Sequence, residues 1–335
     1  MKAKALVCDE KQRFSFEDVI LPDPGPAQMA VRTFRSGVSI GTEFALVQNK
    51  ISWQPYPLCT GYQAVGVVER VGEKIDGFKV GDMVYYRDNK TMQYADGRRI
   101  SCVTGTHCSH AVIDPKNTHG VALLPEGVGI DEASLYVMPA VGLSGVDMAN
   151  PRMGETVAVY GAGMIGLGVA AACAHRGCIV IAIDIDDRRL EIAKKLGADY
   201  AINGSKQNVE QEVKKIAPQG ADAVFESTGI PSCIDAAIPL CKRHGSFVWQ
   251  GNYGSAPVSM RFLPAHGRRL RMFFPCDDGL GPCRRAVIKN MVMGALKWRE
   301  VITHHVEAPE TPGFFDRINK GQAKDVIGAV IHWSD

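Results

Sequence analysis

The feature that most constrains the fold of this chain is a glycine turn between an apolar strand and an apolar helix. It lies in the stretch Val157-Ala158-Val159-Tyr160-Gly161-Ala162-Gly163-Met164-Ile165-Gly166. A helix rich in Ala and Val is expected to continue to about Arg176, and a second apolar run, 178–183, ends at Asp184. The order strand, Gly-x-Gly-x-x-Gly turn, helix, strand and acid predicts a dinucleotide-binding βαβ unit.

Each glycine of the turn has a physical role in such a unit. Gly161 permits the tight turn, Gly163 lets a pyrophosphate approach the backbone, and Gly166 lets the helix pack close to the strand. Met164 and Ile165 open the helix, where N–H groups and the positive end of the helix dipole favour phosphate. The alternative is a glycine-rich turn that binds no nucleotide.

The acid at the end of the second strand predicts which nucleotide is bound. Asp184 can accept hydrogen bonds from a ribose 2′-hydroxyl, whereas a 2′-phosphate would meet its negative charge. Arg188 and Arg189 follow closely and could contact a phosphate. Because Asp184 comes first, we predict NAD rather than NADP, with Arg189 among the cofactor-binding residues.

Composition excludes several classes of protein. The chain has 335 residues and a net charge of +2, which gives no reason to expect nucleic acid or a membrane surface as a partner. It lacks an apolar run of about 18 residues and a signal-peptide pattern at its N-terminus. Its ten cysteines include no C-x-x-C pair. These features predict free thiols and a cytoplasmic protein that acts on a small molecule.

The remaining chain predicts an α/β protein with two domains. Short strands separated by Pro and Gly suggest a small barrel, and six strands alternating with helices suggest a doubly wound parallel sheet. The barrel strands are expected at 4–8, 14–19, 29–36, 64–71, 83–86 and 110–113. The sheet strands are expected at 156–160, 178–183, 200–202, 223–226, 246–250 and 270–274.

Several motifs occur in the order typical of one enzyme family. They are Ser36-Gly37-Val38-Ser39-Ile40-Gly41-Thr42-Glu43, Gly61-Tyr62-Gln63, Val71-Gly72, Phe78, Gly81-Asp82-Met83-Val84 and the glycine turn. Over nearly its whole length the chain resembles the medium-chain dehydrogenase/reductase family, the relatives of zinc alcohol dehydrogenases. The resemblance implies a GroES-like catalytic domain, residues 1–138 and 276–335, and a Rossmann domain, residues 139–275.

The chain departs from this family at the zinc positions. The resemblance places ligands where this sequence has Ile40, Tyr62 and Gln63, and near Tyr136. Residues 87–105 also contain one cysteine, where a structural zinc would need four thiolates. Since Ile cannot bind zinc and neutral Tyr and Gln are poor ligands, we predict a member without bound metal.

One alternative metal site stays open. Cys59, His107, Cys108, His110 and Glu43 could assemble an unorthodox site. Against it, neighbours in a strand point to opposite faces, which makes it hard for His107 and Cys108 to converge. The same alternation argues that His304 and His305 do not share a metal.

Without zinc, side chains must handle the proton of the substrate hydroxyl. The resemblance places Thr42 at the position of a hydroxyl relay, Tyr62 where a metal ligand would point into the site, and Glu43 at the position of a supporting acid. His107 precedes a strand expected beside the site. We predict that these four residues are catalytic. The alternatives are a backbone contact for Thr42, volume filling by Tyr62, a structural ion pair for Glu43 and a loop role for His107.

The resemblance also suggests further cofactor contacts and an assembly. Thr228 and Gly229 would lie along the nicotinamide ribose, and Gln250, Gly251 and Asn252 beside the nicotinamide ring. A Thr228 hydroxyl that only caps a helix is the alternative. The segment Leu270–Pro275 matches the sheet edge at which relatives dimerise, so a homodimer or a dimer of dimers is expected.

These observations predict an NAD-dependent, zinc-independent oxidoreductase. It would interconvert a secondary alcohol, of the sugar, cyclitol or polyol type, and a ketone by hydride transfer. The same motifs also resemble the bacteriochlorophyllide dehydrogenase branch of the family. Two alternatives stay open: an NAD(P)H-dependent reductase of an activated C=C bond or a quinone, and a non-catalytic nucleotide-binding homologue.

Overall fold

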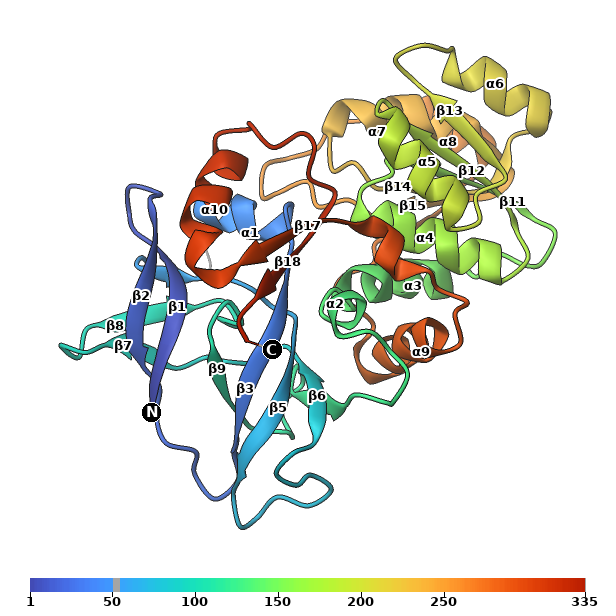
Figure 1. The fold of residues 1–335 in the computed structure, drawn as a ribbon. Coiled ribbons are helices and arrows are strands. Elements are labelled where there is room, and N and C mark those ends of the chain that lie inside the picture. The colour runs from blue at the N-terminus through green and yellow to red at the C-terminus, as the bar shows by residue number, and fades with distance from the viewer. Residues whose placement is uncertain (51–54, 335) are drawn as a thin grey trace. The chain divides into compact units, whose positions relative to one another are not determined.

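The chain forms two compact units in a computed structural model that describes residues 1–50 and 55–334 (Figure 1). The first unit comprises Met1–Tyr136 and Ile302–Asp335, and the second comprises Val137–Val301. The first boundary lies close to the expected division at residue 138. At the second boundary, residues 276–301, which were expected in the GroES-like domain, group with the second unit.

The second unit is built on the predicted parallel sheet. Its six strands run in the order β13-β12-β11-β14-β15-β16, and every neighbouring pair is parallel. The strands are β11 (Thr156–Tyr160), β12 (Ile179–Asp184), β13 (Tyr200–Asn203), β14 (Ala221–Glu226), β15 (Cys241–Trp249) and β16 (Arg271–Phe273). This order reverses direction between β11 and β14, which is where doubly wound sheets bind ligands at the carboxyl ends of their strands. The doubly wound fold is confirmed.

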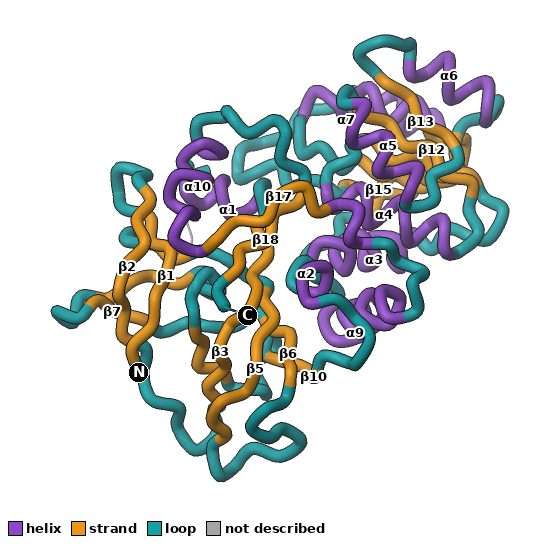
Figure 2. Tube along the Cα trace, in the orientation of Figure 1, coloured by secondary structure: helices purple, strands orange, loops and turns teal. Residues whose placement is uncertain are grey.

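Helices cover both faces of this sheet (Figure 2). They are α3 (Val137–Ala149), α4 (Met164–His175), α5 (Asp187–Lys195), α6 (Val209–Ile216), α7 (Pro231–Ala237), α8 (Phe262–Arg268) and α9 (Leu280–Val292). Helix α5 begins where Asp186 accepts a hydrogen bond from Arg188 N, and it carries Lys194 and Lys195 in its last turn. Helix α9 packs against α3, which explains why residues 276–301 belong to this unit.

The first unit contains the predicted barrel and a second, larger sheet. The barrel closes in the order β1-β2-β7-β8-β4, and the sheet runs β10-β6-β5-β3-β18-β17, with β9 paired to β3. The barrel strands are β1 (Lys2–Cys8), β2 (Phe14–Ile20), β4 (Leu58–Cys59), β7 (Met92–Tyr94) and β8 (Arg99–Cys102). The sheet strands are β3 (Met29–Val38), β5 (Ala64–Val71), β6 (Met83–Tyr86), β9 (His110–Ile113), β10 (Val121–Leu123), β17 (Ile302–Glu307) and β18 (Gly328–His332).

The end of the chain returns to the first unit. Strand β18 pairs antiparallel with β3, so that Ile331 lies opposite Ser36. Three short helices complete the unit: α1 (Thr42–Val47), α2 (Ile130–Ala133) and α10 (Thr311–Asn319). All six predicted strands of this region are present, whereas β4, β7, β8 and β10 were not predicted.

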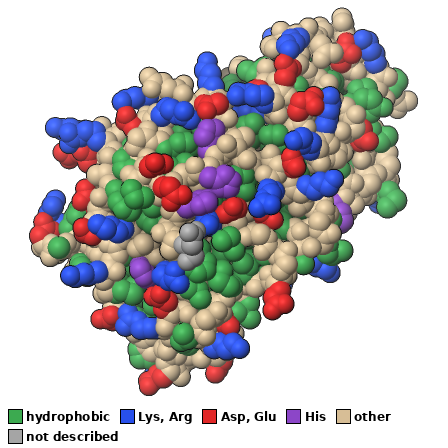
Figure 3. Space-filling model, viewed as in Figure 1, with side chains coloured by type: hydrophobic (Ala, Val, Ile, Leu, Met, Phe, Trp, Pro, Cys, Tyr) green, Lys and Arg blue, Asp and Glu red, His purple; other side chains and the backbone are tan. Residues whose placement is uncertain are grey.

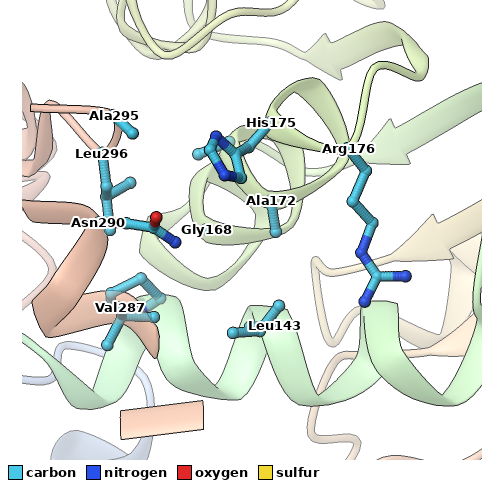
Figure 4. A pocket seen from close by; sticks show the side chains of 11 residues that line it. Leu143, Gly168, Ala172, His175, Arg176, Val287, Asn290, Ala295 and Leu296 are labelled. Carbon is cyan, nitrogen blue, oxygen red and sulfur yellow. The ribbon is translucent and has the colours of Figure 1, made fainter. Parts of the chain in front are cut away.

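Two further features bear on function. Of the helices in the described part of the chain, not one combines the length and apolar character that a bilayer crossing requires. A small, mostly apolar pocket lies among α3, α4 and α9 of the second unit (Figure 4). Leu143, Gly168 and Val287 line it, and none of the predicted cofactor residues does.

Candidate functional site

The glycine turn of the second unit has the geometry that the sequence predicts. Gly161 has φ +101°, a value that favours glycine, and a Cβ at Gly166 would lie 1.9 Å from Gly161 O. In contrast, a Cβ at Gly163 would meet a single atom within 4 Å, Arg189 Nη1 at 3.8 Å. The backbone is therefore open at Gly163, where α4 begins without a side-chain cap.

Asp184 lies directly beside this turn. Its Oδ2 accepts a hydrogen bond from Ala162 N at 2.7 Å, and its Oδ1 accepts from Ile185 N at 2.7 Å and Asp186 N at 3.0 Å. Of the two arginines that follow, Arg188 binds Asp186 at 2.7 Å, whereas Arg189 reaches back to Gly163. The structure therefore brings the acid and one arginine to the turn.

The other predicted cofactor residues meet at the carboxyl ends of β14 and β15. A Cβ at Gly161 would lie 2.8 Å from Thr228 Cγ2, and one at Gly229 would lie 2.7 Å from Asn252 O. Gln250 N and Gly251 N both donate to Glu226 O, at 2.9 and 2.8 Å. The strand ends thus bring together groups that are far apart in the sequence.

Glu226 is a residue of this region that the sequence did not single out as part of a site. Its buried carboxylate accepts hydrogen bonds from Thr228 N at 3.0 Å, from the Thr228 hydroxyl and from the Tyr253 hydroxyl. Burial and the adjacent Glu226 both raise the pKa of Tyr253. Glu226 therefore fixes the two loops that follow β14 and β15. The sequence feature that could have indicated Glu226 is an acidic residue at the end of an apolar strand.

Three buried polar atoms at this edge have no hydrogen-bond partner in residues 1–50 and 55–334: Ser227 Oγ, Trp249 Nε1 and Gln250 Oε1. Buried polar groups are normally paired, so unpaired ones beside a loop suggest that a ligand or water satisfies them. A Cβ at Gly166 would lie 3.3 Å from Ser227 Cβ, which places this hydroxyl at the glycine turn. The open backbone at Gly163 and these atoms fit a bound dinucleotide.

In the first unit, Glu43 and His107 form a buried pair. His107 Nε2 lies 2.8 Å from Glu43 Oε2, and the two side chains are 0% and 1% exposed. Glu43 also accepts hydrogen bonds from Thr60 Oγ1 at 2.8 Å and from Ser39 N at 2.7 Å. Three donors therefore surround one buried carboxylate.

The other ring nitrogen of His107, Nδ1, contacts a residue that the sequence analysis did not associate with it. Ser36 Oγ lies 2.9 Å from His107 Nδ1, and Trp333 Nε1 donates to Ser36 Oγ at 2.8 Å. Because an indole N–H can only donate, the Ser36 proton is available for His107 Nδ1. His107 then donates through Nε2–H to Glu43. Trp333 follows β18, so a single chain segment could not reveal this contact.

Tyr62 and Thr42 lie next to this pair. The Tyr62 hydroxyl donates to Ser39 Oγ at 2.5 Å, and the Arg87 guanidinium lies 5.3 Å from the centre of its ring. Burial raises the pKa of Tyr62 to about 12, although hydrogen bonds with Ser39 and Thr42 act in the opposite direction. Tyr62 is therefore a neutral phenol near pH 7. Thr42 is half-buried at the start of α1.

The residues at the zinc positions do not fit a zinc ion. Ile40 packs against an apolar cluster, and Tyr136 contacts the Tyr85 ring edge-on, with 4.8 Å between ring centres. Tyr62 binds Ser39, and Gln63 is fully buried, with its backbone N–H donating to Thr106. Thiolate, imidazole and carboxylate ligands are all missing from these positions.

The proposed unorthodox ligands also have other partners. Cys59 Sγ donates to Thr60 O and His107 O, and the Cys108 thiol lies in the barrel core, where burial raises its pKa to about 12. His110 Nδ1 lies 3.0 Å from Ser109 Oγ. Within the described residues, these groups do not supply three ligand atoms within 4.8 Å of one another.

Comparison with known families matches both units. The family described as "Alcohol dehydrogenase GroES-like domain" matches residues 25–136, and the one described as "Zinc-binding dehydrogenase" matches residues 165–291. Together these two matches cover most of the chain; the first includes the Glu43–His107 pair, and the second begins at Ile165, within the glycine turn.

Individual relatives match over nearly their whole length. L-threonine 3-dehydrogenase of Shewanella putrefaciens is 26% identical, with 92% of this chain and 94% of the relative covered. An alcohol dehydrogenase of Cupriavidus necator is 28% identical, with 93% and 94% covered. Among solved structures, an Escherichia coli oxidoreductase/dehydrogenase of unknown specificity has a TM-score of 0.86 at 21% identity, with 100% of both chains covered.

Proposed function

This chain belongs to the medium-chain dehydrogenase/reductase family, and from that premise we propose that it interconverts a secondary alcohol and a ketone by hydride transfer with NAD. The observation that carries the proposal is Asp184 beside the open glycine turn, because it combines a phosphate-binding backbone with a carboxylate placed for a ribose. The names of the relatives, dehydrogenases of alcohols and of L-threonine, support oxidation of a hydroxyl-bearing carbon.

The residues of the second unit would hold the cofactor. The N-terminus of α4 at Met164 and Ile165, with Gly163, would bind the pyrophosphate, and Arg189 would contact it from the side. Asp184 would accept from the ribose hydroxyls. Bound NAD supplies the carbon that accepts or donates the hydride.

The residues of the first unit would handle the proton. In alcohol oxidation the substrate hydroxyl would donate to Tyr62 Oη, and as the hydride leaves, its proton would pass to Tyr62 Oη while the Tyr62 proton passes to Ser39 Oγ and from there a proton is released to water. In ketone reduction the same proton transfers would run in reverse, so that Tyr62 donates to the carbonyl oxygen. Thr42, which is half-buried, would hydrogen-bond the substrate oxygen through its hydroxyl and position it next to the Tyr62 hydroxyl.

Glu43 and His107 would act as positioning residues rather than as groups that touch substrate. Both side chains are buried and bound to each other, and Glu43 holds Ser39 and Thr60. Their joint effect is to fix Ser39, the hydrogen-bond partner of Tyr62. This divides the four residues predicted as catalytic into two that meet the substrate and two that orient them.

We propose that this chemistry does not use zinc at the family position, because the residues there cannot bind it. The substrate would be a sugar, cyclitol or polyol, since hydroxyl groups on both Thr42 and Tyr62 suit a substrate that offers several hydroxyls. Because the residues that would handle the proton are intact, a non-catalytic homologue is the less favoured alternative.

Cofactor titration tests the proposal most simply. NADH and NADPH are titrated separately against the purified chain and against Asp184→Ala. We expect NADH to bind at least about tenfold tighter than NADPH, a difference of about 1.4 kcal/mol, and Asp184→Ala to remove that preference. Tighter binding of NADPH would contradict the proposal and favour the C=C or quinone reductase.

A substrate screen separates an enzyme from an idle binder. NAD⁺ reduction is followed over a panel of polyols, cyclitols, sugars and simple secondary alcohols, with wild type and Tyr62→Phe. We expect turnover with at least one polyhydroxylated compound and a fall in kcat of about 100-fold in Tyr62→Phe. If the chain binds NADH but oxidises no alcohol of the panel, the result would favour the interpretation as a non-catalytic homologue.

We also propose that the chain forms a homodimer through β16. This strand is at the end of the sheet order, and edge strands offer unpaired backbone groups. Phe262, Leu263 and Phe274, which flank it in the sequence, are 64%, 75% and 65% exposed. Light scattering after size exclusion should give twice the chain mass, and a monomer at micromolar concentration would refute the proposal.

A further inference from the structure

Two histidines and an aspartate meet at the surface of the first unit, apart from the residues discussed above. His305 lies on β17, His332 on β18 and Asp131 on α2. His305 Nδ1 lies 2.9 Å from His332 Nε2, and Asp131 Oδ2 lies 3.8 Å from His305 Nδ1. Figure 3 shows histidine side chains gathered over these strands with acidic side chains beside them.

The separation of the two ring nitrogens suits a shared metal ion. Zinc–nitrogen bonds are about 2.0–2.1 Å long, so two nitrogens on one tetrahedral ion lie roughly 3.3 Å apart. The observed 2.9 Å is the length of a hydrogen bond between the two rings, and a small separation of the rings would give the zinc spacing. The parallel pairing of β17 and β18 holds the two rings on neighbouring strands, and the rings meet edge to face.

Asp131 is held so that one oxygen remains for a ligand. Arg35 Nε donates to Asp131 Oδ1 at 2.9 Å, while Oδ2 faces His305. The Arg35 side chain is 9% exposed and Asp131 is 18% exposed, so neither is a freely moving surface group. A fixed carboxylate loses little freedom when it binds an ion.

A second carboxylate lies on the other side of His332. Glu307 Oε1 is 3.8 Å from His332 Nδ1. Histidines that bind metals commonly direct their second nitrogen toward a carboxylate, which fixes the tautomer and strengthens the ligand.

We propose that His305 Nδ1, His332 Nε2 and Asp131 Oδ2 bind one divalent transition-metal ion such as Zn²⁺. The fourth position is taken by water, because His305 is 50% exposed and the site opens to solvent. The ion links β17, β18 and α2, which come from residues far apart in the sequence. It is a structural metal ion that stabilises the first unit, and it takes no part in hydride transfer.

The test uses the full-length protein, stripped with a chelator and titrated with ZnCl₂ by calorimetry. We expect one tight site per chain, with affinity reduced about 100-fold or more in His305→Ala and in His332→Ala. His304→Ala is the matched control: His304 is the next residue on the same strand but contacts Asp325 at 3.1 Å, so zinc binding should not change. Equal affinity in wild type and both variants would overturn the site.

Two further measurements keep the test decisive. With Co²⁺ in place of Zn²⁺, the visible absorption spectrum should be that of a cobalt ion with nitrogen and oxygen ligands, and it should disappear in His305→Ala. A thiolate charge-transfer band would show that cysteines bind the ion and would refute the proposal. Thermal unfolding should shift upward with ZnCl₂ in wild type and in His304→Ala only. NADH affinity should be the same in all variants, so failure of this site and failure of the proposed function are distinguishable.

Discussion

The glycine turn of the second unit and the Glu43–His107 pair of the first unit are built in opposite ways. At the turn, the important groups are backbone N–H groups and empty space, and Gly163 leaves the start of α4 open. At the pair, the important groups are side chains, and almost every polar atom has a partner. The turn has open backbone groups that a ligand could bind, whereas the polar atoms of the pair are already bound to one another and to their neighbours.

This difference predicts how substitutions will act. A change at the turn should affect mainly nucleotide binding and the packing of one helix against one strand. A change at the pair should affect mainly stability, because buried donors lose their acceptor. The following four experiments are arranged from the largest expected effect to the smallest.

The largest effect is expected for Glu43→Ala. Removing this carboxylate leaves Ser39 N, Thr60 Oγ1 and His107 Nε2 without an acceptor, and we expect the free energy of unfolding to fall by about 3–5 kcal/mol. Urea denaturation measures the change. Glu73→Ala, an exposed acid of the same unit, should stay within about 0.5 kcal/mol of wild type. A loss below about 1 kcal/mol in Glu43→Ala would show that the pair does not organise the first unit.

Gly166→Ala tests the turn in the same way. The added Cβ would lie 1.9 Å from Gly161 O, so strand and helix must separate, at a cost of about 1–3 kcal/mol and with loss of NADH binding. Gly267→Ala in α8 is the matched control, since a Cβ there meets no atom within 4 Å. That variant should gain about 0.5–1 kcal/mol and bind NADH normally. Normal binding by Gly166→Ala would refute the assigned role of the turn.

Alkaline pH should affect the barrel core through Cys108. Burial raises the pKa of this thiol from 9.0 to about 12, so the folded state keeps the proton that the unfolded chain loses. Its contribution to stability is complete below pH 9 and declines toward pH 12. The expected slope is about 1.4 kcal/mol per pH unit. Cys108→Ala should remove this part of the slope, whereas Cys276→Ala, at an exposed thiol, should not.

The smallest effect is expected for Trp333→Phe. A smaller aromatic ring remains, but Ser36 loses the donor at 2.8 Å, which should cost about 1 kcal/mol. The ¹⁵N shifts of His107 report on its tautomer and should change, because Ser36 is then free to reorient. Unchanged shifts would mean that Ser36 does not set the tautomer.

The contrast between the two sites also explains what could be predicted from the sequence. The proposed nucleotide site depends on glycine spacing and on an acid at a strand end, which are local features, and Asp184 and Arg189 do lie at the turn. The first-unit site depends on Ser36, His107 and Trp333. The pairing of β18 with β3 brings Trp333 to Ser36, and the segment that precedes β9 brings His107 to the same hydroxyl. Local patterns cannot show such contacts.

The histidines of β17 illustrate the same limit. Alternation along one strand places His304 and His305 on opposite faces, and the structure gives them different partners. The partner of His305 is on the neighbouring strand, at His332, and periodicity within one strand cannot reveal it.

The most direct test of the central claim uses the double variant His305→Ala/His332→Ala, which lacks the proposed surface site. The protein is treated with a chelator, its metal content is measured, and NAD⁺ reduction is followed with the alcohol that the screen identifies. The account predicts turnover at the untreated rate with well under one metal ion per chain. Activity that is lost with the metal and restored only by added Zn²⁺ would contradict it.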